Sequence, residues 1–553
     1  MRTLYKLLIP CLILTGCSDF LERSAQDLII PSTTREYKEI LQGDAYFKNL
    51  LANYLFVIYM TDDVEFFDGN FLAEEGTAGR NWSIKEDSRF ATFFDAYRWA
   101  DEVENSILSD NAYGYLYSQA LTANVCLEAA ETSEGTAEEK EILIGQASFT
   151  RAFAYLMLAN LYAKPYGQSA PDDPCVPIKL TSGPVTTTFA RSTTAEVWKL
   201  ITDDVEAALS NLKGKSITNI YEINHKAALI LAARAALYME DWDKAIRYGE
   251  EFLATYGAAH PLYDITTQYR ATASTLQSRD NVVINFYNND NKELVWVFGP
   301  SSIAYTYNGY ISGMGNSSIY WRVSSPLDKN AGGTVYREII QSEEEMKKTL
   351  IGQYNFTVTR STAQVITAVT GDRRPVYWFM PPKGNYTVSP SGRYNYVSLK
   401  YDPTDGHLVG SMAFRTGEIY ITLAEAYARR NTGSDITKAI SMLNDLRSTR
   451  IAPYAGTAEE LTATTFAAPQ ALVEFIWQER RRELCFEELH RWWDMRRTNQ
   501  PAVTHKWRTT SYSLAQGDGA YVLNFPLKER DFNGGRLQPN IRPVRPEDPQ
   551  PTN

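Results

Sequence analysis

Residues 227–238 read Ala-Ala-Leu-Ile-Leu-Ala-Ala-Arg-Ala-Ala-Leu-Tyr, and residues 240–253 read Glu-Asp-Trp-Asp-Lys-Ala-Ile-Arg-Tyr-Gly-Glu-Glu-Phe-Leu. Alanine and leucine favour a helix, and the small alanine side chains allow a neighbouring helix to approach closely. The acidic stretch 240–243 interrupts the apolar pattern, and a second apolar pattern begins after it. The sequence therefore predicts two helices joined by a short acidic turn.

The same pattern recurs at residues 415–448. Ile419, Leu423 and Tyr427 fall on one predicted helix face, and Asn-Thr-Gly-Ser at 431–434 predicts a turn before a second helix. Repeated helical hairpins of this kind are typical of tetratricopeptide-like scaffolds, whose surfaces more often bind partners than catalyse reactions.

Helical periodicity dominates residues 35–254. Residues 146–163 place apolar side chains at steps of three and four, and Thr193 or Thr194 is expected to cap a helix that runs to about Leu209. Three tryptophans fall on predicted helices with apolar periodicity, and we expect them in the core: Trp99, Trp198 and Trp242.

The helical period fades between residues 255 and 410. Short β-prone runs occur at 282–287 and 294–298, and Gly, Asn, Ser and Tyr fill the stretches between them. We therefore predict a mainly α-helical protein with a tetratricopeptide-like scaffold and an inserted loop-rich, partly β lobe that binds a ligand.

The N-terminus resembles a bacterial lipoprotein signal. Arg2 and Lys6 precede an apolar run that is too short to span a bilayer, and Leu14-Thr15-Gly16 lies directly before Cys17. We expect cleavage after Gly16 and lipidation of Cys17, which would anchor the chain to a membrane without crossing it. The predicted order of segments is a signal peptide at 1–16, a lipidated tether at 17–34, an N-terminal scaffold at 35–254, a variable lobe at 255–410, and a C-terminal helical segment and tail at 411–553.

Composition excludes several classes of protein. The formal net charge of −11 argues against nucleic acid as a partner, since an acidic surface repels phosphates. The five cysteines show no zinc-binding spacing, and the five histidines form no metal-binding or triad pattern. In contrast, the 35 tyrosines outnumber the 23 phenylalanines, which suits a surface where flat rings face water.

Several blocks together resemble the SusD/RagB family of outer-membrane nutrient-binding lipoproteins. Residues 479–487 read Glu-Arg-Arg-Arg-Glu-Leu-Cys-Phe-Glu and residues 490–497 read His-Arg-Trp-Trp-Asp-Met-Arg-Arg, the most specific of these blocks. The others lie at 17–22, 151–167, 415–426 and 443–447. The end of the chain departs from the family pattern, because residues 533–540 follow the usual ending only loosely.

The resemblance implies a helical SusD-like fold at the outer membrane, exposed on the cell surface, above a SusC-type TonB-dependent transporter. It implies a protein that captures oligosaccharides, or in some members peptides, for nutrient uptake, and that performs no catalysis.

Two aromatic stretches suit a glycan site, because flat rings cover the apolar faces of sugars while polar neighbours bind their hydroxyls. The resemblance places ligand-binding rings in about these two parts of the chain. One stretch lies within 68–85 and the other within 305–321. The candidate ligand-binding residues are Asp68, Asn70, Asn81, Trp82, Tyr305, Tyr307, Tyr310, Tyr320 and Trp321.

Two charged runs invite other interpretations. Residues 480–482 are three arginines, but glutamates at 479, 483, 487 and 488 on the same predicted helix favour pairing along that helix over a polyanion site. Residues 62–65 read Asp-Asp-Val-Glu and are expected in a solvated loop or helix start. A glycosidase needs two carboxyls across a cleft and calcium needs six or more oxygens, neither of which the sequence assembles. No metal site and no cofactor is predicted, although a bound calcium stays open.

The sequence thus favours a lipid-anchored glycan-binding protein. A peptide-binding lipoprotein is the alternative on the same fold, because the acidic run at 62–65 would suit basic peptides. A surface glycosidase and a purely structural adaptor are the other two alternatives.

Overall fold

The structure of the chain is a computed structural model. It describes residues 31–48, 53, 56–66, 94–100, 111–184, 188–268, 286–299, 321–323, 374, 379–380, 397–398, 409–410, 412–451, 460–507 and 510–543.

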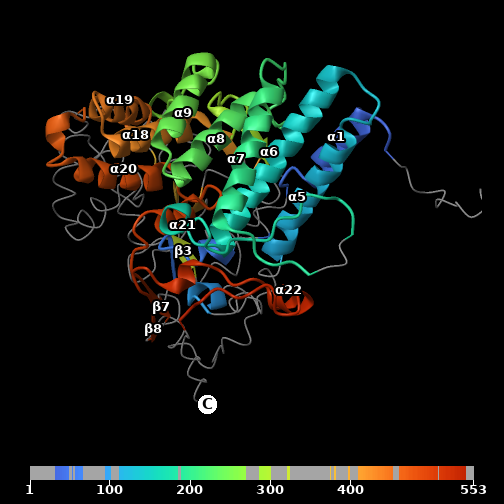
Figure 1. Cartoon of the computed structure of the whole chain (residues 1–553). Coiled ribbons are helices and arrows are strands. Elements are labelled where there is room, and N and C mark those ends of the chain that lie inside the picture. Colours follow the sequence, from blue (N-terminus) through green and yellow to red (C-terminus); the bar gives the residue numbers. More distant parts are fainter. Residues whose placement is uncertain are drawn as a thin grey trace, which may run out of the picture.

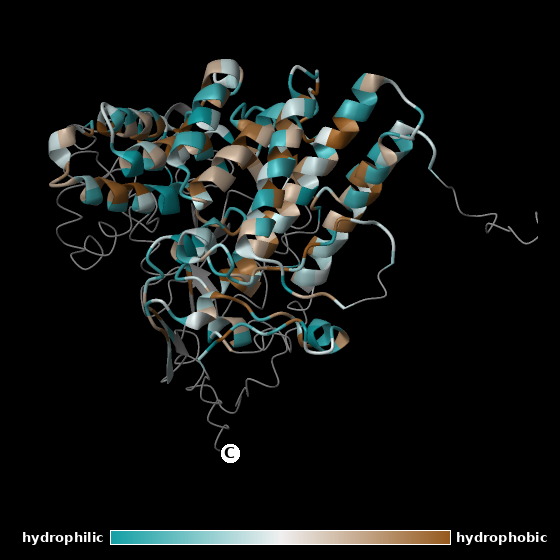
Figure 2. Cartoon of the chain, viewed as in Figure 1, coloured by the Kyte–Doolittle hydropathy of each residue, from teal (hydrophilic) through white to brown (hydrophobic). Residues whose placement is uncertain are grey.

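The N-terminal half of the described chain is a row of helices that lie side by side (Figure 1). Consecutive helices contact one another along this row, as the predicted hairpins require. Figure 2 shows hydrophilic and hydrophobic residues mixed along these helices. The helices are α1 (Thr34–Asp44), α5 (Asn111–Ala129), α6 (Ala137–Tyr162), α7 (Thr194–Leu212), α8 (His225–Tyr238) and α9 (Trp242–Tyr256).

Threonine-glutamate pairs begin three of these helices. Thr33, Thr136 and Thr193 each accept a hydrogen bond from the backbone N–H of a glutamate three residues later, and that glutamate binds back to the cap. Such a capping box satisfies two backbone donors that a helix start otherwise leaves unpaired. Thr193, one of the two predicted caps, is therefore confirmed as the residue before α7.

Helix α6 is the centre of the row. Among the described residues it is the one helix long and apolar enough to cross a membrane, but 83% of its most apolar stretch is buried inside the protein. Its close approach to α7 depends on Gly145, where an added Cβ would lie 2.6 Å from Cγ of Leu212. The apolar residues of α6 thus serve as protein core.

A second set of helices continues the row from the C-terminal part of the chain (Figure 1). The predicted hairpin is confirmed as α18 and α19, whose turn begins with Asn431 in the left-handed conformation. α9 packs against α18, and the Tyr427 hydroxyl donates to Glu250 across that contact. The elements of this part are α18 (Thr416–Arg430), α19 (Asp435–Ser448), α20 (Pro469–Leu484), α21 (His490–Arg497) and α22 (Leu527–Phe532), with the short α10 (Ile265–Gln268) before them and the 3-10 turns η2 (Tyr166–Gln168), η7 (Ala463–Thr465) and η8 (Gly519–Tyr521).

The strands form two-stranded antiparallel sheets. Their pairs are β1 (Val64–Phe66) with β3 (Trp321–Val323), β2 (Leu294–Phe298) with β6 (Met412–Arg415), β4 (Phe379–Met380) with β5 (Val397–Ser398), and β7 (Val503–Trp507) with β8 (Thr510–Leu514).

The β2–β6 pair is part of the core. Trp296 is fully buried, and its ring lies 5.1 Å from that of Phe149 on α6 and 5.2 Å from that of Phe414 on β6. The predicted strand at 294–298 is therefore confirmed. Of the run at 282–287, only Phe286 and Tyr287 are described, and they form a buried bend.

The predicted tryptophans lie in or against the core. Trp99 and Trp198 are buried, whereas Trp242 is half-buried against the core. One detail was wrong, because Trp99 lies in a turn with φ of +54° and not on a helix. The mainly helical, tetratricopeptide-like architecture is as predicted, and the division of the chain at 255 and 410 stays a prediction.

Candidate functional site

The turn that enters β1 is fixed by side chains from distant parts of the chain. The indole of Trp99 donates to the Met60 carbonyl over 2.9 Å, and Nε2 of His505 lies 3.1 Å from the Thr61 carbonyl. The His505 ring stacks between Tyr97 and Trp99, with 4.2 Å between ring centres on each side. Its Nδ1 lies 2.6 Å from the Tyr97 carbonyl. β7, which carries His505, thereby holds the backbone of this turn.

Two arginines hold the carboxylates of the same turn. Arg491 of α21 forks onto Asp62, with Nε to Oδ1 and Nη2 to Oδ2 both at 2.7 Å. Arg481 of α20 donates to Asp63 Oδ1 over 2.9 Å and to the Asp62 backbone carbonyl over 3.0 Å. We call Asp62, Asp63, Arg481 and Arg491 the β1 clamp.

The clamp corrects one prediction. The run at 62–65 is neither a solvated loop nor a helix start, because Asp63 is 1% exposed and Val64 begins β1. The reason is the pair of arginines, which lie about 420 residues away in sequence and neutralise both carboxylates. A buried aspartate is tolerated where a charged partner replaces its water.

The electrostatics of the clamp follow from burial and these partners. Burial alone would raise the pKa of Asp62, but Arg481 and Arg491 outweigh it and hold that pKa well below its usual range. Burial raises the pKa of Asp63, and the neighbouring Asp62 charge adds to the rise, although Arg481 opposes it. The Asp62–Arg491 pair thus stays charged at neutral pH.

The pairing of β1 with β3 bears on the predicted ligand site. Phe66, the last residue of β1, pairs with Trp321, the first residue of β3. In an antiparallel pair such residues have Cα atoms about 5 Å apart. The chain therefore leaves β1 toward the 68–85 stretch at the same end of the sheet where it arrives from the 305–320 stretch. The two aromatic stretches, separated by more than 200 residues in sequence, share one point of attachment.

Most predicted site residues lie outside the described residues. Trp321 is placed by its backbone at the start of β3. The predicted residues outside the described ranges are Cys17, Asp68, Asn70, Asn81, Trp82, Tyr305, Tyr307, Tyr310 and Tyr320.

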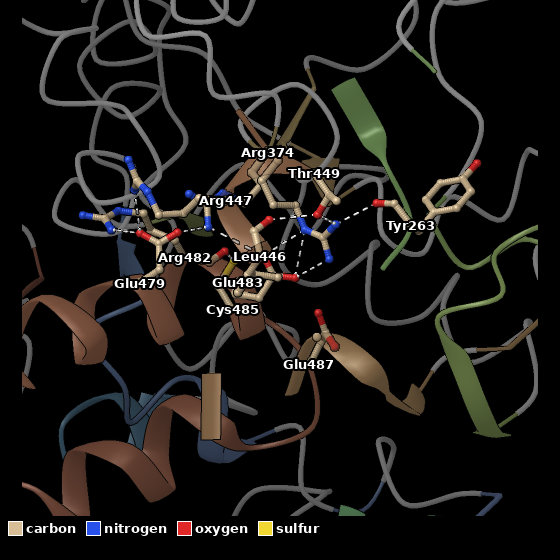
Figure 3. Close-up of polar contacts among 12 residues, drawn as sticks. Tyr263, Arg374, Leu446, Arg447, Thr449, Glu479, Arg482, Glu483, Cys485 and Glu487 are labelled. Carbon is tan, nitrogen blue, oxygen red and sulfur yellow. Dashed lines mark hydrogen bonds and ion pairs between the residues drawn. The ribbon is translucent and has the colours of Figure 1, made fainter. Parts of the chain in front are cut away.

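A second set of charges is buried where α20 meets the rest of the scaffold (Figure 3). Glu483 accepts hydrogen bonds from Arg450 at 2.9 Å and from Arg415 at 2.7 Å, and Glu293 accepts from the same two arginines. Glu479 accepts from Arg374 at 2.5 Å, which ties a described residue of the predicted lobe to α20. All six side chains are at most 1% exposed.

This network corrects the predicted pairing of the arginine run. Within α20, Arg482 does pair with Glu479. Arg480, however, pairs with Asp494 of α21 at 2.9 Å, and Arg481 pairs with Asp63 in the β1 clamp. The helix ends at Leu484, so Glu487 and Glu488 lie beyond it and bind arginines of other elements: Glu487 binds Arg415 and Glu488 binds Arg234. The run is structural, as predicted, but it joins elements and does not mainly reinforce one helix.

Within the described ranges, no group of three or more His, Cys, Asp or Glu side chains could hold a metal ion. The described cysteines, Cys126, Cys175 and Cys485, are buried.

Sequence reasoning missed the residues that hold the β1 turn. Arg481 was recognised as ion-paired but was given the wrong partner, and neither Arg491 nor His505 was connected with the turn. A signal was present, since buried arginines need acidic partners and the run at 62–63 supplies two. Nothing in a single sequence indicates which arginine meets which carboxylate.

The comparisons with known proteins agree with this architecture. Residues 20–237 match a SusD-like family described as "Starch-binding associating with outer membrane", and residues 254–521 match the SusD family. The chain belongs to the SusD/RagB family. The resemblance that the sequence motifs predicted is thereby confirmed.

Relatives of this SusD/RagB protein include a SusD-like protein of Formosa agariphila, which is 24% identical over 433 residues, 72% of this chain and 75% of the relative. A SusD superfamily structure from Bacteroides vulgatus covers 93% of this chain and 100% of its own, with a TM-score of 0.63 and 15% identity. One from Bacteroides thetaiotaomicron covers 92% and 100%, with a TM-score of 0.62 and 18% identity. A structure described as a SusD-like carbohydrate binding protein from Bacteroides vulgatus covers 92% and 98%, with a TM-score of 0.56 and 18% identity. These likenesses confirm the SusD-like fold.

Proposed function

We propose that this SusD/RagB protein is a lipid-anchored protein of the outer-membrane surface that binds oligosaccharides and delivers them to a SusC-type TonB-dependent transporter. It would act by binding alone, without catalysis. The lipid would be attached to Cys17, and the ligand would contact rings of the 68–85 and 305–321 stretches.

The observation that carries this proposal is the β1–β3 pairing. A glycan site needs several rings brought together, because one ring covers only one sugar face. Phe66 and Trp321 are paired, so both aromatic stretches start from one place on the scaffold. The family match and the description of one relative as a carbohydrate binding protein support the choice of a glycan as the ligand.

The peptide-binding alternative loses the argument that favoured it. The acidic run at 62–65 was expected to attract basic peptides from solution. Asp62 and Asp63 are instead neutralised by Arg481 and Arg491 inside the protein, so their charge does not reach a ligand in the way that was expected.

Glycan binding is tested by native-gel retardation. The soluble protein that begins after Cys17 would be run in gels cast with soluble starch, xylan, laminarin or pectin. We expect retardation by one of these, and loss of that retardation in Trp82→Ala or Trp321→Ala. The matched control is Phe532→Ala, which removes a ring that is 75% exposed on α22, outside both aromatic stretches.

The outcomes separate the alternatives. Retardation that both tryptophan variants retain would place the site elsewhere on the protein. Shortened polysaccharide after incubation would contradict the non-catalytic role. If no glycan retards the protein, glycan binding by the isolated chain is refuted, and peptides become the next ligands to test.

Anchoring and the partner need cellular tests. The full chain and its Cys17→Ala variant would be expressed with an affinity tag in a bacterium that carries SusC-type transporters. We expect the unaltered chain in the outer-membrane fraction, accessible to added protease and co-purified with a transporter. The variant should leave that fraction, and equal membrane association of both forms would refute lipid anchoring through Cys17.

A further inference from the structure

We propose that Arg491 and Arg481 are positioning residues for ligand binding. Through the β1 clamp they would fix the β1–β3 sheet, and with it the common starting point of the two aromatic stretches, relative to the helical scaffold. This inference rests on the proposed function, because its functional readout is glycan affinity.

The sheet needs such a support. β1 and β3 have three residues each and pair only with one another among the described strands. An isolated two-stranded sheet is marginally stable at best, and one of three residues per strand has few hydrogen bonds of its own. Its orientation must therefore come from contacts with neighbouring elements.

The clamp supplies directional contacts at the start of β1. The fork of Arg491 onto Asp62 fixes the carboxylate plane, because two parallel hydrogen bonds at 2.7 Å restrict both distance and rotation. Arg481 adds a contact to the backbone, at the Asp62 carbonyl, as well as to the Asp63 side chain. Asp63 immediately precedes Val64, so this geometry is passed directly to the strand.

The backbone of the turn is held by further contacts. The Met60 and Thr61 carbonyls face Trp99 and His505, while the two carboxylates face α20 and α21. The turn is thus held between two parts of the scaffold. The two aspartates and two arginines also balance in charge, which favours a role in positioning over direct recognition of a charged ligand.

Arg491→Lys is the decisive variant, because it keeps the charge but loses the fork. Loss of one charge-assisted hydrogen bond would lower the fraction of molecules in the binding-competent orientation, and the apparent Kd rises as that fraction falls. We expect the Kd to rise about tenfold for whichever of the four polysaccharides retards the unaltered protein. Without any ligand, amide hydrogen exchange in a peptide covering 60–66 should become faster.

Arg151→Lys is the matched control. Arg151 forks onto Asp204 with two hydrogen bonds of 2.8 Å, and its side chain is 15% exposed, against 19% for Arg491. That pair joins α6 to α7 within the scaffold. We expect the control to lower Tm while glycan affinity and exchange at 60–66 stay unchanged.

The result expected for Arg491→Lys is weaker binding and faster exchange at 60–66, measured well below Tm. Unchanged affinity and unchanged exchange would overturn the proposal, as would an equal loss of affinity in Arg151→Lys. If Arg491→Lys does not fold, the near-isosteric Asp62→Asn replaces it under the same criteria. If the unaltered protein binds none of the polysaccharides, the proposed function fails, and exchange at 60–66 still decides whether the clamp orders β1.

Discussion

The buried carboxylate of Glu488 leads to a prediction about how stability depends on pH. Its carboxylate accepts hydrogen bonds from Arg234 at 2.8 and 3.1 Å, but Arg234 also forks onto Glu418 at 2.6 and 2.7 Å. One guanidinium therefore serves two carboxylates, and all three side chains are at most 3% exposed. Burial raises the pKa of Glu488 to about 7, and the charges of Glu418 and Glu487 add to the rise, although Arg234 opposes it.

The sign and size of the effect follow from linkage. The folded protein holds the Glu488 proton more tightly than the unfolded chain, in which the pKa is about 4.5. The stabilisation is complete below pH 4.5 and is lost as the pH rises through about 7. Each pH unit between these values removes about 1.4 kcal/mol, so the free energy of unfolding falls by about 3 kcal/mol across the window.

The assay is urea denaturation from pH 4.5 to 8, on the unaltered chain and on Glu488→Gln, whose amide substitutes for the protonated carboxyl. We expect the stability of the unaltered chain, relative to this variant, to fall by about 3 kcal/mol with rising pH. The control is Glu474→Gln, an exposed change on α20. The stability of the unaltered chain relative to this control should not fall with rising pH. A difference between the unaltered chain and Glu488→Gln that is constant with pH would refute the reasoning.

Three further predictions concern the scaffold. Glu483→Gln leaves buried arginines short of a counter-charge and should cost about 3–5 kcal/mol of unfolding free energy in urea denaturation; a change below 1 kcal/mol would contradict this. Thr136→Ala removes the α6 capping box and should cost about 1 kcal/mol, measured by the same method with exposed Thr464→Ala as control. Gly145→Ala should lower Tm, because overpacking against Leu212 costs about 1–3 kcal/mol, which exceeds the gain in helix propensity. A raised Tm would contradict this, because it would mean that α6 and α7 can move apart at little cost.

Local patterns predicted the helices well. The hairpin at 227–253 could be recognised because its small residues, acidic turn and returning helix all lie within 30 residues. The cap at Thr193 follows from a threonine with a glutamate three positions later, and Thr33 and Thr136 repeat that pattern. In each case the interaction that decides the structure joins neighbours in sequence.

The site was less accessible because its interactions join distant residues. The composition of 62–65 is that of a solvated loop, and only the partners Arg481 and Arg491 make it a buried strand entry. Likewise, both aromatic stretches could be selected from composition, but their common origin depends on the Phe66–Trp321 pairing. A pairing across more than 250 residues leaves no periodic trace in the sequence.

The β2–β6 pair has a consequence for how such chains diversify. Phe298 and Met412 are paired, so the chain departs from the core and re-enters it at positions whose Cα atoms are about 5 Å apart. The stretch of more than a hundred residues between Phe298 and Met412 is therefore an insertion into the scaffold whose two ends are adjacent. The entropy of closing a loop grows slowly with its length. The insertion can therefore be exchanged or resized while the helices keep their places, as long as its contacts with the scaffold, the β1–β3 pairing and the Arg374–Glu479 pair, are kept. A chimaera joined at these two positions would transplant one member's insertion onto another member's scaffold under that condition.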